Sequence, residues 1–189
     1  MGKKAERAMS INRREAMTLA LGATMIGFGM SDAQAASDKL DMQLKDGTVV
    51  IELRPDLAPK AAERMITLTK EGFYNNTPFH RVIPGFMAQG GDPTGTGTGG
   101  SQLPNLPAEF TNEAKFLTGT VGMARTADPN SANSQFFICL APAPWLDGQY
   151  TIVGQVIEGM NHVEDIKKGS GANGLVTDPD RIIKMTVAQ

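Results

Sequence analysis

The stretch FHRVIPGFMAQGGD, residues 79–92, places a histidine, an arginine and a glutamine among large apolar residues. Alternation along a strand puts Arg81 and Ile83 on one face, and His80 and Val82 on the other. No serine, cysteine or clustered carboxylate stands beside the histidine, so the stretch offers no obvious nucleophile. A face that collects arginine, glutamine and large apolar side chains indicates either a small apolar pocket with a polar rim or ordinary surface. The pattern alone leaves both open.

Four further segments have the composition of β-strands. They are rich in β-branched or aromatic residues, and Gly, Pro, Asp or Asn bounds them. They are residues 48–53, 135–140, 151–157 and 181–187. In the first of them, Val49, Ile51 and Leu53 fall on one face, which is the period of two that a half-buried strand shows.

Only two segments break this strand pattern. Residues 59–71 open with Pro59, which suits a first helical turn, and a glycine follows them. Residues 161–168 form a shorter helical segment that two lysines and a following glycine close. Many strands with two distant helices favour a mainly β fold, a closed antiparallel barrel with the helices over its open ends.

The segment QFFICL, residues 135–140, shows which face of its strand is outward. Gln135 and Phe137 share one face, and Phe136 and Ile138 share the other. Because one face must be core, the face with the glutamine is the outward one. We therefore expect Phe137 to lie near solvent.

Composition bounds the class of protein. The 189 residues allow one domain with a substantial core. A 41 % hydrophobic content and a net charge of −2 do not point to a nucleic-acid or membrane-surface partner. Cys139 is the only cysteine, which excludes an internal disulfide and a Cys-rich zinc site. No segment reaches the ~20 apolar residues that a spanning helix needs.

The first 35 residues have the pattern of an export signal. Five lysines and arginines precede the uncharged stretch 16–30, and an A-x-A sequence follows, so we expect cleavage between Ala35 and Ala36. The adjacent Arg13 and Arg14 favour a twin-arginine signal, with general secretion as the alternative route and a first helix of the fold as the alternative interpretation. Removing five basic and three acidic residues leaves 36–189 as one periplasmic domain with a net charge of −4.

Other motifs have simpler explanations. GTGTGG (95–100) fits the dinucleotide pattern G-x-G-x-x-G, but no helix can open on it, so a surface turn is the better interpretation. Cys139 and His80 suggest a thiol-protease pair, yet Cys139 belongs to an apolar strand, where a lone cysteine usually packs inertly. His80 and His162 lie far apart in sequence and do not indicate a metal site.

Five segments of the chain together match one known family. They are FHRVIPGFMAQGGD, GTGG (97–100), SQFFIC (134–139), WLDG (145–148) and the spaced run PNSANSQFF. Through them the chain resembles the cyclophilin family of peptidyl-prolyl cis–trans isomerases. The resemblance extends over residues 40–187 and implies an eight-stranded antiparallel barrel capped by two helices. It also implies catalysed rotation about X-Pro bonds. That reaction makes and breaks no covalent bond, so it needs no nucleophile, cofactor or metal ion.

The resemblance assigns roles residue by residue. Arg81 matches the catalytic arginine of the family. The positions that match the wall of the proline pocket are Phe86, Met87, Phe137 and Leu146. Those that match hydrogen-bonding partners of the substrate backbone are Gln89 and Gln135. Those that match the groove for residues before the proline are Gly97, Ala124, Arg125 and Thr126. Trp145 matches the pocket-edge tryptophan that the family associates with cyclosporin-type ligands.

Two positions depart from the best-known family pattern. Tyr150 stands where a histidine often closes the pocket, and Arg125 with Thr126 replaces a small polar pair, which adds positive charge to the groove. The implied partners are proline-containing peptides and unfolded or folding proteins, with neither nucleic acid nor stable membrane insertion. No apolar seam is evident in the sequence, so we expect a monomer.

Two other functions are the alternatives. A peptide-binding chaperone module without turnover would keep the same pocket, but an intact Arg81 favours an enzyme. A chymotrypsin-like barrel hydrolase would need a Ser–His–Asp set, and His80 and His162 are the only histidines available.

Overall fold

The computed structural model of the protein describes residues 38–189. Their strands are β1 (Lys39–Leu44), β2 (Gly47–Leu53), β3 (Arg81–Ile83), β4 (Met87–Gly90), β5 (Thr120–Met123), β6 (Phe136–Cys139), β7 (Ile152–Glu158) and β8 (Lys184–Val187). Their helices are α1 (Pro59–Lys70), α2 (Met160–Glu164) and the 3-10 turn η1 (Pro144–Leu146). The predicted export signal and its cleavage site lie outside the described residues.

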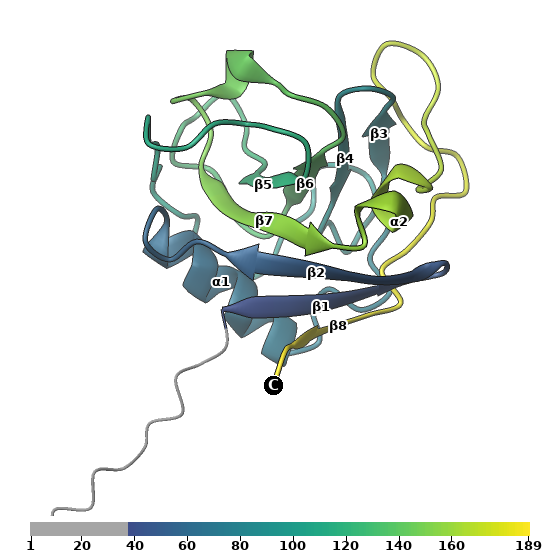
Figure 1. The fold of residues 1–189 in the computed structure, drawn as a ribbon, viewed down its shortest axis with the longest axis horizontal. Helices are drawn as coiled ribbons and strands as arrows, with labels where there is room; N and C mark the ends of the chain where they lie inside the picture. The colour runs from purple at the N-terminus through teal and green to yellow at the C-terminus, as the bar shows by residue number, and fades with distance from the viewer. Residues whose placement is uncertain (1–37) are drawn as a thin grey trace, which may run out of the picture. The chain divides into compact units, whose positions relative to one another are not determined.

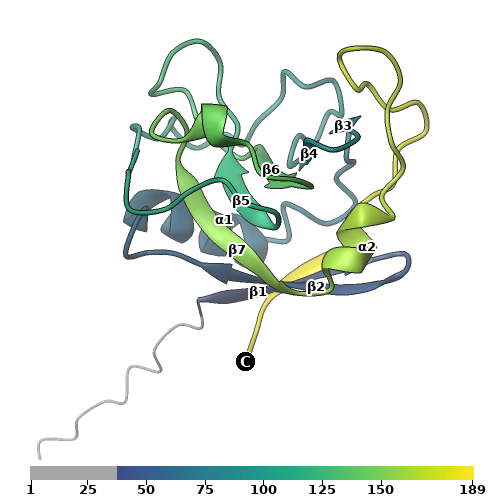
Figure 2. The same ribbon diagram turned by 45° about the horizontal axis from the view of Figure 1, so that its top comes forward.

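All eight strands form one antiparallel sheet in the order β3-β4-β6-β5-β7-β2-β1-β8. The sheet is strongly curled (Figures 1 and 2). Its edge strands β3 and β8 do not form a ladder with each other. The segments before them are joined instead, since Asn76 N–H donates to the Ile182 carbonyl at 2.7 Å and Phe79 N–H to the Asp180 carbonyl at 2.9 Å. The predicted mainly β fold of eight antiparallel strands and two helices is confirmed. The sheet is a strongly curled half-barrel and not the closed barrel predicted, because only these short segments join its two edges.

The two helices lie toward opposite ends of the curled sheet (Figure 1), and both contribute side chains to one hydrophobic core, Met65 from α1 and Val163 from α2. α1 begins at Pro59, as predicted, and contacts β7 and β8, whereas α2 contacts β2. The prediction of a helix through residue 168 is wrong, because α2 ends at Glu164. Lys167 N–H donates to Asp180 Oδ2 at 2.8 Å instead of to a carbonyl one turn back, which diverts the chain from the helix. Among the described residues no helix is long and apolar enough to cross a membrane.

The sheet carries a hydrophobic cluster on each of its faces. Alternation along β6 places Phe136 and Ile138 in the main core. The opposite face carries a second cluster that contains Met87, Phe137 and Cys139, and η1 packs on it. The predicted division of the two faces is therefore confirmed. The prediction that Phe137 lies near solvent is wrong, because its side chain is only 5 % exposed.

Candidate active site

Four residues from four neighbouring strands form one row across the outer face of the sheet. Arg81 of β3 pairs with Gln89 of β4, and Gln89 pairs with Phe137 of β6. Phe137 in turn pairs with Gly122 of β5. Because directly opposed residues share a face, the register brings a cation, an amide and an aromatic ring side by side.

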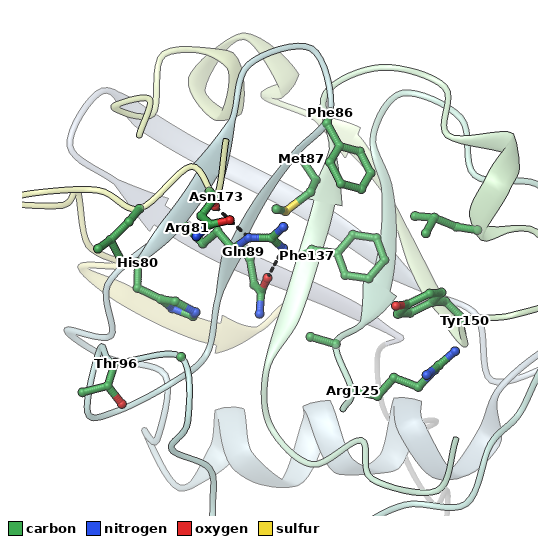
Figure 3. Close-up of a pocket in the computed structure, with 14 residues that line it drawn as sticks. His80, Arg81, Phe86, Met87, Gln89, Thr96, Arg125, Phe137, Tyr150 and Asn173 are labelled. Carbon is green, nitrogen blue, oxygen red and sulfur yellow. Dashed lines mark hydrogen bonds between the residues drawn. The ribbon is translucent and has the colours of Figure 1, made fainter. Parts of the chain in front are cut away.

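A cavity of about 420 Å³ lies over this row. The residues predicted for the site that line it are Arg81, Phe86, Met87, Gln89, Gly97, Ala124, Arg125, Phe137, Leu146 and Tyr150. Apolar side chains form its floor and one wall, and polar side chains stand at its rim, which is the usual character of a ligand site. Sequence segments far apart in the chain thus meet at one pocket (Figure 3).

The Arg81 guanidinium extends toward Met87 and Phe137 (Figure 3). Its Nε donates to the Asn173 carbonyl at 2.9 Å, and its Nη1 donates to Gln89 Oε1 at 3.1 Å. None of the ion pairs within residues 38–189 includes Arg81. A guanidinium has five N–H donors, so this fixed cation keeps N–H groups and its full charge for a ligand.

Phe137 forms the floor of the cavity because the opposed residue has no side chain. A Cβ on Gly122 would overlap the rings of Phe137 and Phe116. The absence of that atom lets Phe137 lie over the sheet, stacked on Phe116 at 5.7 Å between ring centroids and edge-on to Tyr150 at 5.9 Å. The ring is thereby buried on the sheet side and still lines the cavity.

A second cavity of about 460 Å³ adjoins the first. It contains the predicted residues Thr126 and Gln135, and shares with the first cavity Gln89, Gly97, Ala124 and Arg125. Gln135 Nε2 donates to the carbonyls of Gly97 and Gly99, and Gln89 Nε2 donates to Gln135 Oε1 at 2.9 Å. Amide groups therefore stand where the two cavities meet.

Arg125 is held in place on the shared rim. Its Nε and Nη2 donate to the Gln149 carbonyl, and its Nη1 donates to the Thr126 carbonyl at 2.8 Å. The guanidinium also lies 4.3 Å from the centroid of the Tyr150 ring, a cation–π distance. Tyr150, one of the positions that depart from the family pattern, thus both lines the cavity and orients a cation.

Trp145 is the one predicted site residue that lines neither cavity. It is 57 % exposed, and its ring lies 5.4 Å from that of Phe86 at an interplanar angle of 52°. Since Phe86 lines the cavity, Trp145 supports the pocket edge from outside.

The glycine-rich loop after β4 is organised by a carboxylate of the protein itself. Gly97 and Gly99 both donate their N–H groups to Asp92. The donors that a bound phosphate would need are therefore occupied, in agreement with a turn. Burial raises the pKa of Asp92, but hydrogen bonds from Thr94, Gly99 and Gly97 outweigh this and hold the pKa below its ordinary value.

Residues 39–187 match the profile of the family described as "Cyclophilin type peptidyl-prolyl cis-trans isomerase/CLD". The chain belongs to this family. It is a peptidyl-prolyl cis–trans isomerase, as the sequence resemblance implies.

Individual relatives agree with this assignment. This cyclophilin is 51 % identical to a "Probable peptidyl-prolyl cis-trans isomerase" of Brucella suis, over 95 % of its own chain and 97 % of the relative. It is 44 % identical to a peptidyl-prolyl cis–trans isomerase of Schizosaccharomyces pombe, over 65 % of its chain and 80 % of the relative. A crystal structure of a Cryptosporidium parvum cyclophilin in the presence of the dipeptide Ala-Pro is similar to it, with a TM-score of 0.73 and 34 % identity. The similarity covers 80 % of this chain and 99 % of that one.

Four further residues line the first cavity without having been predicted from the sequence, namely His80, Thr96, Asn173 and Leu175. Alternation predicts His80 on the face opposite Arg81, and its side chain is buried. Its burial lowers the pKa of the imidazole, and neither ring nitrogen has a hydrogen-bond partner. Asn173 and Leu175 belong to the segment before β8, which reaches Arg81 through tertiary contacts that no local pattern reports.

The Cys139 thiol is expected to be unreactive in this cyclophilin. Burial raises its pKa to about 12, so little of the nucleophilic thiolate forms near neutral pH. A thiol-specific disulfide reagent at mildly alkaline pH should label the folded protein slowly and the unfolded protein at one thiol per chain. Rapid labelling of the folded protein would contradict this and would support the thiol-protease pair of Cys139 and His80.

Within residues 38–189 no three His, Cys, Asp or Glu side chains gather to hold a metal ion.

Proposed function

We propose that this cyclophilin accelerates X-Pro rotation by directing the Arg81 guanidinium at the proline nitrogen while the ring rests on Phe137. The observation that carries the proposal is a cation without an ion pair beside an apolar floor. Met87, Phe86 and Leu146 supply the remaining apolar wall.

The chemistry requires no covalent intermediate. Amide resonance opposes rotation with a barrier of ~18–20 kcal/mol, and this resonance is lost when the bond twists. The proline nitrogen then becomes pyramidal and gains a lone pair that accepts a hydrogen bond. Arg81 therefore interacts better with the twisted state than with either planar isomer, and this difference lowers the barrier.

One hydrogen bond does not supply the whole acceleration. A charge-assisted hydrogen bond contributes ~1.5–3 kcal/mol, or about one to two powers of ten in rate. An apolar, water-poor floor disfavours the dipolar planar amide and strengthens the arginine contact. A further part of the rate acceleration comes from holding the proline ring on Phe137 while the carbonyl group of the preceding residue rotates.

Substrates of this mechanism are proline-containing peptides and folding proteins. Gln89 and Gln135 stand between the two cavities and are available to the peptide backbone, with the residues before proline in the second cavity. The Ala-Pro dipeptide present with the Cryptosporidium relative supports this substrate class. The exposed Trp145 at the pocket edge is the position at which a cyclosporin-type ligand would bind.

Exchange spectroscopy on a short prolyl peptide tests the proposal. The protein should exchange the cis and trans peptide signals faster than the uncatalysed reaction, which takes tens to hundreds of seconds. The peptide should stay uncleaved after long incubation, which excludes the hydrolase. Binding without faster exchange would instead support the chaperone alternative.

Arg125 is expected to favour peptides with an acidic residue before proline. It lines both cavities, and no carboxylate of the described chain forms an ion pair with it. Peptides with Glu two positions before proline should show kcat/KM about threefold to fivefold above their Lys counterparts, the range of a partly exposed ion pair. Added salt should reduce the difference through screening.

The preference ratio within each variant is the measurement. Arg125→Gln should bring the Glu/Lys ratio close to one. Lys70→Gln removes the same charge from the exposed end of α1, outside both cavities, and should keep the wild-type ratio. An equal fall in both variants would assign the preference to overall charge.

We also propose that the protein is exported to the periplasm and cleaved after Ala35, as the twin-arginine pattern of the first 35 residues indicates. N-terminal sequencing of the protein from a periplasmic fraction should begin at Ala36. An intact Met1 in the cytoplasm would contradict export.

A further inference from the structure

One buried carboxylate has no part in the mechanism above. Asp92 follows β4, is fully buried, and takes part in no ion pair of the described chain. Its Oδ1 accepts from the Thr94 N–H at 2.8 Å and hydroxyl at 2.7 Å. Its Oδ2 accepts from Gly97 N–H at 2.6 Å and Gly99 N–H at 3.1 Å. Since a buried carboxylate is costly unless hydrogen-bonded, these four bonds tie the loop firmly to Asp92.

The same two glycines present their carbonyl groups to Gln135. Gln135 Nε2 donates to the Gly97 carbonyl at 3.1 Å and to the Gly99 carbonyl at 2.8 Å. Because Asp92 holds the N–H of each of these glycines, it restrains the loop segment that carries both carbonyl groups.

This arrangement permits one orientation of two successive amides. Gln135 must direct its NH₂ group at the carbonyls, since its oxygen would be repelled by them, so its Oε1 faces Gln89. Gln89 must then direct its NH₂ group at Gln135 and its Oε1 at Arg81. The donor–acceptor direction that begins at Asp92 therefore ends at the guanidinium, and Figure 3 shows its last step, from Gln89 to Arg81.

We infer that Asp92 is a positioning residue for Arg81, acting through the glycine loop, Gln135 and Gln89, an inference that rests on the proposed role of Arg81. In Asp92→Asn the side-chain NH₂ group would face backbone N–H donors, so some of the hydrogen bonds that fix the glycine loop are lost. Both glutamine amides then gain alternative orientations, and Arg81 lies less often over the proline nitrogen. We expect kcat to fall roughly tenfold and KM to change less, as for a misplaced catalytic group.

A double-mutant cycle separates positioning from general loop damage. In a Gln135→Leu background the connection is already broken, so Asp92→Asn should lower kcat by no more than about twofold further. The control Thr94→Val removes the hydroxyl bonds to Asp92 and to Thr96 but keeps both glycine bonds to Asp92, so it should retain the wild-type kcat. The side-chain amide NMR signal of Gln89 should move in Asp92→Asn and stay in place in Thr94→Val.

A full tenfold loss in the Gln135→Leu background, or an unmoved Gln89 signal in Asp92→Asn, would overturn the inference. If Asp92→Asn does not fold, Gly99→Ala replaces it in the cycle, because the added methyl group would press on the Asp92 carboxylate. Arg81→Ala is measured alongside. If that variant keeps its kcat, the proposed function fails while the Gln89 signal still tests the connection. If it loses kcat and the cycle is additive, only the inference about Asp92 fails.

Discussion

Replacing Arg81 by alanine should lower kcat for a prolyl peptide by about a hundredfold, the effect of removing one donor that is aimed at a transition state. The Kd of the peptide should rise much less, because Phe137 and Met87 still hold the proline ring. The physical reason is that the guanidinium meets a lone pair which exists only in the twisted bond. Exchange spectroscopy at saturating peptide gives kcat, and a chemical-shift titration gives Kd.

The stability of Arg81→Ala should change little, within about 1 kcal/mol, because the side chain is half-buried at the cavity, where water can replace its hydrogen bonds to Asn173 and Gln89. Arg54→Ala is the matched control, since Arg54 is paired with Asp56 at 2.6 Å and lines neither cavity. It should retain full turnover. Equal losses of kcat and affinity in Arg81→Ala would show that Arg81 only binds the peptide.

Local patterns were sufficient for the elements whose ends are determined locally. Pro59 starts α1 where a first-turn proline is expected, and alternation in β6 separates Phe137 from Phe136 correctly. The predicted ends of helices and strands are wrong where a residue distant in the sequence determines where the element ends. Asp180 accepts the N–H that would have continued α2, so the helix stops earlier than its own sequence indicates. The predicted strand from 181 likewise starts at Lys184, because the residues before it bridge to the segment before β3.

The sequence predicts those residues of the site that lie within linear motifs. Arg81, Gln89 and Phe137 lie on separate motifs, and only the strand register shows that they form one row. Asn173 and Leu175 carry no motif and reach the pocket through tertiary contacts alone. The burial of Phe137 was missed because a glutamine on the same face suggested solvent, whereas a second apolar cluster covers that face beyond the glutamine.

Phe137→Ala should both destabilise the fold and weaken substrate binding. Truncating a buried phenylalanine costs ~3–5 kcal/mol of unfolding free energy, since transfer and cavity terms add. Here the lost contacts include the stacked Phe116 ring, and Gly122 offers no side chain that could fill the space. KM should rise about tenfold, because a proline ring over a cavity loses roughly 1–1.5 kcal/mol of apolar contact. Arg81 remains in place, so kcat should fall less than in Arg81→Ala.

Phe136→Ala is the control that separates an effect on substrate binding in the pocket from an effect on the stability of the fold. Phe136 precedes Phe137 on β6, is fully buried and points into the main core, where it meets the Tyr74 ring edge-on at 5.6 Å. Its truncation should lower the free energy of unfolding by a similar amount and leave KM close to wild type, with both variants measured well below their melting temperatures. If the two truncations raise KM equally, general loosening of the sheet explains the effect, and Phe137 is not a specific floor for the proline ring. A tenfold rise in KM confined to Phe137→Ala would instead show that the two faces of one short strand have different roles. One face stabilises the fold, and the other binds the substrate.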